Sequence, residues 1–177
     1  MIPMADDLQR EATDLLARLI RFKTVNPPGD EREAQEFLAG YLGDAGLECE
    51  LLAADDARPN LIARLRGDSP GPTLCLLGHV DTVLADPSAW THDPWSGEVV
   101  DGFVWGRGAL DMKGQVAAEV AAAAALARGG WRSPRRWRSG AILSRALSPM
   151  RGMDACPATP SVVRLKRNTP FSAQQMP

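Results

Sequence analysis

Cysteine is scarce in this chain of 177 residues, and long apolar runs are missing. The three cysteines form no Cys-x-x-Cys pair, which argues against both a thiolate zinc site and a disulfide scaffold. The longest apolar run, residues 116–127, is interrupted by Glu119 and is too short to span a bilayer. Asp6 and Asp7 precede any apolar run, so the N-terminus does not read as a secretory signal. We therefore predict a cytoplasmic protein without a membrane partner.

Acidic residues are almost absent from the last quarter of the chain. Residues 1–128 carry 11 Lys+Arg against 21 Asp+Glu, a balance of −10, whereas residues 129–177 carry 9 against Asp154 alone, a balance of +8. The apolar periodicity also stops there, and prolines and arginines are scattered from Trp131 onward. We therefore predict a folded domain over 1–130 and a basic, irregular and unstructured tail over 131–177.

Within the first 130 residues, helical and strand patterns alternate. Apolar residues recur at helical spacing over 6–22 and 34–42, and "TVNPPGD" breaks the chain between these segments. "EVVDGFVWGRG" reads as a short hairpin, and Asp111 opens an alanine-rich helix that ends at Gly129-Gly130. The near-continuous apolar run 73–77 suits a strand covered on both faces. Two further strands are expected at 47–53 and 61–65, so the fold class is α/β, with layers of helices and strands.

Polar residues stand where the strand 73–77 ends, in "TLCLLGHVDTV". Positions i and i+2 of a strand face the same way, so His79 and Asp81 should point together from the end of the strand. A metal-bound imidazole needs its second ring nitrogen held, commonly by a carboxylate. His79 and Asp81 could therefore be a metal ligand and the group that orients it. The alternative is an ordinary polar strand end with a hydrogen-bonded histidine. His-x-Asp taken alone favours this alternative over a metal site.

A second motif, "GRGALDMKG", covers residues 106–114. Gly106 and Gly108 permit a tight bend, after which the Asp111 carboxylate could lie across from the His79 strand and bridge two cations. Two alternatives remain: a nucleotide-binding glycine loop, which lacks its last glycine, and a helix N-cap role for Asp111. Lys113 and Arg107 also lie in the motif; we assign them no role and expect solvated or salt-bridged charges.

The two motifs together, with "W-x-x-DPW" between them, resemble the dinuclear zinc amidohydrolases and exopeptidases. That family includes acetylornithine deacetylase, succinyl-diaminopimelate desuccinylase, aminoacylase and glutamate carboxypeptidase, and the likeness covers residues 7 to about 130. The resemblance implies part of a three-layer zinc-exopeptidase-like catalytic domain with a truncated mixed sheet. It implies that His79 binds one metal, that Asp81 supports His79, and that Asp111 bridges two divalent ions, zinc or cobalt. It also implies a cis peptide after Asp111.

The same resemblance implies groups that this chain lacks. The family continues with a Glu-Glu pair that supplies the general base and a metal ligand, then an acidic ligand, a histidine ligand and a lid domain used for dimerisation. Here the last glutamate is Glu119, and the only histidines are His79 and His92. A catalytic zinc commonly has three protein ligands. We therefore expect weak or absent metal binding, with no general base present and the substrate-binding residues unknown.

The resemblance implies hydrolysis of a carbon–nitrogen amide bond in a small N-acylated amino acid or peptide. The chain could borrow its missing groups from another polypeptide, or it could be an inactive, truncated remnant. A third hypothesis is nucleic-acid binding through "WRSPRRWRS", where arginines are interleaved with tryptophans. We favour a change of reading frame near Gly129 over a selected nucleic-acid site. The oligomeric state cannot be read from the sequence.

Overall fold

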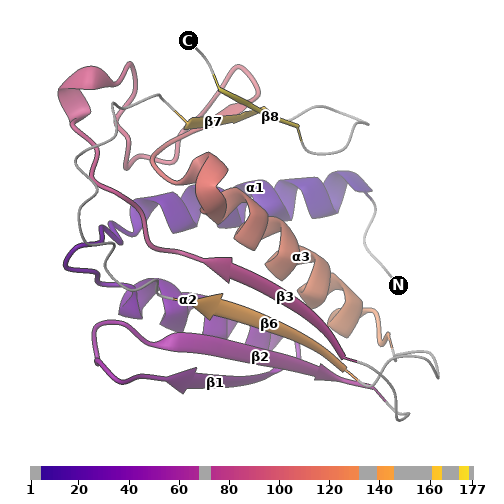
Figure 1. Cartoon of the computed structure of the whole chain (residues 1–177). Coiled ribbons are helices and arrows are strands. Elements are labelled where there is room, and N and C mark those ends of the chain that lie inside the picture. Colours follow the sequence, from indigo (N-terminus) through magenta and orange to yellow (C-terminus); the bar gives the residue numbers. More distant parts are fainter. Residues whose placement is uncertain (1–4, 68–72, 132–138, 146–160, 165–171, 176–177) are drawn as a thin grey trace.

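The protein is described by a computed structural model that covers residues 5–67, 73–131, 139–145, 161–164 and 172–175 (Figure 1). Along the chain these residues form α1 (Ala5–Arg21), α2 (Arg32–Asp44), β1 (Glu48–Leu52), β2 (Asn60–Arg66), β3 (Thr73–His79), η1 (Pro87–Ala89), β4 (Val99–Val100), β5 (Phe103–Trp105), η2 (Ala109–Lys113), α3 (Gly114–Arg128), β6 (Ser139–Arg145), β7 (Ser161–Arg164) and β8 (Ser172–Gln175). Here η1 is a single 3-10 turn, and η2 is a short turn of mainly helical residues that is interrupted by the non-helical Asp111 and Met112.

The main sheet is mixed and has the strand order β1-β2-β6-β3 (Figure 1). β1 pairs antiparallel with β2, β2 pairs antiparallel with β6, and β6 runs parallel to β3. A second sheet has the order β4-β5-β7-β8. The predicted hairpin is confirmed, since β4 and β5 are antiparallel and join at Asp101-Gly102.

The helices pack on one face of the main sheet. Leu51 is opposite Leu61, and both Leu61 and Gly78 are opposite Ser144, so these positions share one face. On that face the fully buried Leu61 belongs to one hydrophobic cluster with residues of all three helices. The Gly78 backbone approaches Val116 of α3 so closely that an added Cβ would lie 2.7 Å from its Cγ2 atom. The core therefore lies between this face and the helical layer.

The opposite face of the sheet is open among the described residues. Leu77 of β3 is 51% exposed, and Cys75 is exposed. On β1 and β2 the same face carries the ion pairs Arg66–Glu48 and Arg64–Glu50. The prediction that the strand 73–77 is covered on both faces is therefore wrong, because an apolar run does not show whether a second layer is present. The α/β class is confirmed, and the described residues supply two layers, one of helices and one of strands.

Residue patterns explain the helices. α1 places acids in its first turn and Arg18 and Arg21 in its last, as the helix dipole favours. α3 ends at Arg128 with Gly129 as its C-cap, as predicted. Among the described residues, no helix combines the length and apolar character that crossing a bilayer requires.

Strands β6, β7 and β8 lie within the segment 131–177 that was predicted to be unstructured. Apart from Trp131, the rest of that segment lies outside the described residues, so the division at residue 130 stays a prediction.

Candidate metal centre

The end of β3 brings His79 and Asp81 together. His79 Nδ1 lies 3.0 Å from a carboxylate oxygen of Asp81 and 3.2 Å from the Asp81 backbone oxygen. The Asp81 side chain is 6% exposed and that of His79 is 17% exposed. The carboxylate therefore sits behind the imidazole, and the Nε2 atom remains on the side away from Asp81.

Asp111 reaches that Nε2 atom from the second motif. Its Oδ1 oxygen lies 3.3 Å from His79 Nε2, and its side chain is 85% exposed. Asp111 belongs to the η2 turn, and the peptide bond to Met112 is cis, as the resemblance implied. Gly108 allows the turn to approach the β3 loop: it has φ +83°, and an added Cβ would lie 2.6 Å from Cγ2 of Thr82.

The prediction that Asp111 opens the helix is wrong. Asp111 has the extended angles φ −123° and ψ 97°, and α3 begins at Gly114 with no side-chain cap. Because the carboxylate does not cap the helix, it is available to a cation. The apolar period could not locate this boundary, since the η2 turn also contains buried residues, Ala109 and Lys113.

The spacing of His79 and Asp111 fits a shared cation. A tetrahedral zinc ion with ligands at about 2.0–2.1 Å holds two donor atoms roughly 3.3 Å apart, which matches the Nε2–Oδ1 distance of 3.3 Å. A neutral imidazole and a carboxylate are also suitable donors for such an ion. Among the described residues, however, no group of three or more His, Cys, Asp or Glu could hold a metal. These donors fit part of a metal site, not a whole one.

The environment of His79 favours its protonated form while no metal is bound. The hydrogen bond with Asp81 is the largest cause that raises the pKa of His79, and the charges of Asp81 and Asp111 act in the same direction. Burial opposes this rise. A metal ion that binds Nε2 must therefore compete with a proton.

Asn26 is a residue of this site that the sequence did not reveal. Its side-chain Nδ2 donates to Asp81 Oδ2 over 2.9 Å, and its backbone N–H donates to the Thr82 carbonyl oxygen over 2.8 Å. Thr82 N–H in turn donates to the Thr24 carbonyl oxygen over 2.8 Å. The "TVNPPGD" segment thus lies beside the β3 loop and holds the second oxygen of Asp81. Its prolines and glycine had indicated only a break between helices.

Lys113 is buried, so the expectation of a solvated or salt-bridged charge is wrong. Its side chain is 0% exposed, and Nζ donates to the carbonyl oxygens of Leu19 and Phe22 at 2.9 and 2.8 Å. Burial lowers the pKa of Lys113 to about 7, against an opposing contribution from the charge of Asp81. Lys113 thereby ties the turn that carries Asp111 to the last turn of α1. Arg107 is placed differently, with its guanidinium 5.2 Å from the ring of Trp90.

His92 and the α1–α2 hollow lie apart from this site. His92 Nδ1 is 2.6 Å from Glu98 Oε1, and the centre of its ring lies 4.3 Å from that of Trp105.

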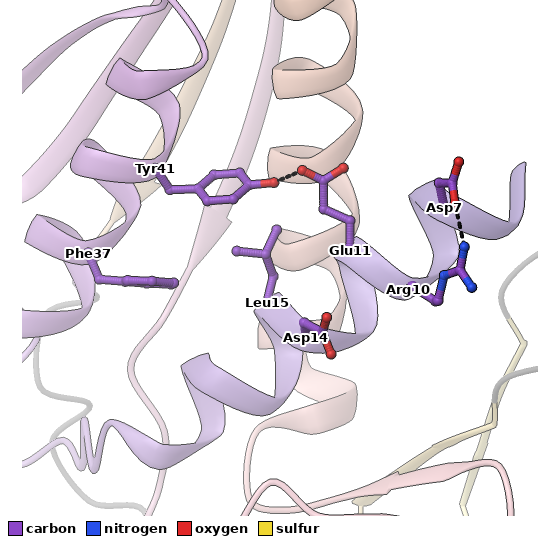
Figure 2. A pocket seen from close by; sticks show the side chains of 7 residues that line it. All are labelled: Asp7, Arg10, Glu11, Asp14, Leu15, Phe37 and Tyr41. Atoms are coloured by element: carbon purple, nitrogen blue, oxygen red, sulfur yellow. Dashed lines mark hydrogen bonds and ion pairs between the residues drawn. The ribbon is translucent and has the colours of Figure 1, made fainter. Parts of the chain in front are cut away.

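A hollow of about 490 Å³ opens between α1 and α2 (Figure 2). Figure 2 shows the Tyr41 hydroxyl donating to Glu11 and Arg10 paired with Asp7. The remaining lining residues are Asp14, Leu15 and Phe37, so none of the site residues lines the hollow.

Comparison with known proteins connects this arrangement to a family. Residues 75–138 match the model of Peptidase family M20/M25/M40. The succinyl-diaminopimelate desuccinylase of Paracoccus denitrificans is 46% identical over 124 residues, which are 70% of this chain and 30% of that protein. The desuccinylase of Xanthobacter autotrophicus is 47% identical over 118 residues, or 64% of this chain and 30% of that protein. The chain thus spans about a third of the length of these relatives.

Solved structures show the same fold. Human carnosine dipeptidase 1 matches with a TM-score of 0.67 and 24% identity over 79% of this chain and 32% of that chain. An M20 family metallo-carboxypeptidase from Sulfolobus solfataricus matches with a TM-score of 0.65 and 20% identity over 76% of this chain and 30% of that chain. The resemblance stated from the two motifs is confirmed, and so is its restriction to an N-terminal part.

Proposed function

We propose that this chain, which carries the N-terminal part of an M20-type metallohydrolase domain, contributes to metal-dependent hydrolysis of carbon–nitrogen amide bonds. His79 Nε2 and Asp111 would bind the metal, and Asp81 would orient His79. The observation that carries the proposal is the 3.3 Å approach of Nε2 to the exposed Asp111 carboxylate, with Asp81 behind the imidazole. A histidine that binds a metal almost always donates its second ring N–H to a carboxylate, a backbone carbonyl or water, and Asp81 is placed to accept that bond here.

Each side chain has a distinct task in this proposal. Asp81 would accept a hydrogen bond from His79 Nδ1–H, so the proton stays on Nδ1 and the lone pair of Nε2 faces Asp111. The Asp111 carboxylate has two oxygens and is 85% exposed, so it can serve two cations at once. When bound, zinc or cobalt would polarise the amide carbonyl and lower the pKa of a water towards ~7. The desuccinylases and the dipeptidase that this chain resembles point to a substrate amide attached to an amino acid.

The proton transfers of such a reaction need a general base, and we propose that this chain lacks one. The sequence holds no glutamate after Glu119, and its part of the fold covers about a third of its relatives. We therefore propose weak metal binding and no turnover by this polypeptide alone. Activity would require groups from a second polypeptide that supplies the remaining ligands and the base.

Metal binding at His79 is the test. We propose to titrate the protein with Zn²⁺ or Co²⁺ and to follow the imidazole nitrogens in long-range ¹H–¹⁵N spectra. The chain has only two histidines, so His92 is an internal reference. We expect a metal-dependent shift at His79 Nε2 that Asp111→Asn weakens by at least tenfold, while His92 stays unchanged. No shift at His79, or an equal response in Asp111→Asn, would refute the assignment.

Turnover is a separate measurement. We expect that N-succinyl and N-acetyl amino acids release no amine above background with this chain alone, with or without added metal. Metal-dependent release that disappears in Asp111→Asn would contradict the proposed incompleteness but would support the assigned site.

A further inference from the structure

A buried ion pair lies close to the Asp81 carboxylate. Glu31 at the start of α2 is 0% exposed, and the Arg58 side chain, between β1 and β2, is 12% exposed. Arg58 Nε lies 3.0 Å from Glu31 Oε2, and Arg58 Nη2 lies 3.1 Å from Glu31 Oε1. Such a two-pronged pair is geometrically specific, but burying it costs more than burying apolar residues of the same size. It therefore calls for a role beyond stability.

The "TVNPPGD" segment connects this pair to the site. An added Cβ on Gly29 would lie 2.3 Å from Arg58 Nε, so the guanidinium rests directly on the Gly29 backbone. Gly29 N–H donates to the Val25 carbonyl oxygen over 2.8 Å, which closes the turn that presents Asn26 to Asp81. Arg58 thus packs against the turn whose Asn26 side chain grips Asp81.

Arg58 also acts on Asp81 through its charge. The hydrogen bonds with Glu31 are the largest cause that raises the pKa of Arg58, and the charge of Asp81 raises it further. Asp81 is 5% exposed and faces His79 Nδ1 on one side and Asn26 Nδ2 on another. A carboxylate withdrawn from water to this extent needs cationic or hydrogen-bonding neighbours. Arg58 supplies the permanent positive charge.

We propose that Arg58, clamped by Glu31, is a positioning residue that keeps Asp81 in place and thereby holds the His79 ring with Nε2 towards Asp111. The Glu31–Arg58 pair reaches Asp81 through the turn at Gly29 and Asn26, and Asp81 in turn contacts His79, which faces Asp111. These residues come from four separate segments of the sequence. The effect of this positioning on catalysis rests on the proposed function. The positioning of His79 can be measured without metal.

The test compares paired substitutions, because removing Arg58 alone would strand the buried Glu31 carboxylate. Glu31→Gln/Arg58→Met removes the buried pair together, and Glu50→Gln/Arg64→Met removes an exposed pair of the same chemistry on the open sheet face. Arg58→Lys keeps the charge without the planar fork and serves as the conservative variant. Circular dichroism establishes that each protein is folded.

The first readout is the tautomer of His79 in metal-free protein, from long-range ¹H–¹⁵N spectra at a pH where the ring is neutral. We expect the wild type and the Glu50/Arg64 variant to show Nδ1-protonated His79. Glu31→Gln/Arg58→Met should show a mixture of both tautomers, and Arg58→Lys an intermediate ratio. His92 should not change in any of them. The second readout is the zinc concentration at the midpoint of the His79 titration. We expect this concentration to be about tenfold higher without the buried pair, because mutation of a residue that supports a metal ligand typically weakens metal binding by at least this factor.

A folded Glu31→Gln/Arg58→Met protein with unchanged tautomer and unchanged zinc midpoint would overturn the proposal. Should that variant not fold, Arg58→Lys decides, and a wild-type tautomer ratio in it refutes the inference. A tautomer change in a protein whose wild type takes up no zinc would support the positioning role and reject the metal site. Zinc uptake that is equal in all variants would reject the positioning role and support the metal site.

Discussion

Replacing Lys113 with methionine tests the consequence of burying an ammonium group between α1 and the η2 turn. Burial lowers the pKa of Lys113 from 10.5 to about 7 in the folded protein. In the unfolded chain the amine keeps its proton up to about pH 10.4. Between these values the unfolded state binds more protons, so the free energy of unfolding rises with pH. Each pH unit contributes about 1.4 kcal/mol, or up to ~4 kcal/mol from pH 7 to pH 10.

Lys113→Met should lose this rise, because methionine has similar length and no titrating group. At pH 10 the variant should also be less stable than the wild type, by about 0.5–1.5 kcal/mol for each hydrogen bond that it loses. Those bonds end on the carbonyl oxygens of Leu19 and Phe22, each of which keeps a backbone N–H donor. Urea unfolding at pH 7, 8, 9 and 10 measures both effects. Lys23→Met is the matched control, since Lys23 is exposed. The reasoning fails if Lys113→Met and the wild type gain equal stability over this range.

Three further outcomes follow from the site. Asn26→Ala leaves a buried oxygen of Asp81 without that donor and should cost about 1–3 kcal/mol in urea unfolding; unchanged stability would show that the bond is unimportant. Gly108→Ala should destabilise by more than ~1 kcal/mol because its φ is +83° and the added methyl meets a side chain. Gly40→Ala, inside α2 with nothing within 4 Å, should instead stabilise by roughly 0.5–1 kcal/mol. Zinc affinity should fall about tenfold for each pH unit below the raised pKa of His79, since metal and proton compete for Nε2; a pH-independent affinity would exclude His79 as a ligand.

Apolar periodicity located most of the regular elements. α1, α2, β1 and β2 lie within one or two residues of the predicted ranges, since each is amphipathic and its period appears in a short window. The same reasoning failed for the surroundings of β3, where Leu77 is exposed although its neighbours read as a buried strand. A local pattern records the preference of a strand for apolar contact, but whether another layer provides that contact is decided elsewhere in the chain.

The sequence likewise predicted some residues of the candidate metal centre and missed others. His79, Asp81 and Asp111 stand in two short motifs with a recognisable spacing, so the candidates could be named before any coordinates. Asn26, Arg58 and Glu31 could not, because each lies in a segment whose turn residues or helical pattern already explained it. Their bonds also cross long stretches of sequence: the Asn26–Asp81 bond spans 55 positions and the Arg58–Glu31 bond spans 27.

The sequence by itself determined where α1 and α2 lie, the hairpin, and the break in composition near residue 129. It also contained the pair of motifs that points to a hydrolase. Only the tertiary structure decided that Asp111 stands 3.3 Å from the imidazole of His79, that Lys113 is buried under α1, and that one face of the main sheet is open in the part of the chain that the structure describes. The physical reason is the range of the interactions. Propensity and periodicity act over a few neighbouring residues, whereas burial and ion pairing depend on segments that meet only when the chain has folded.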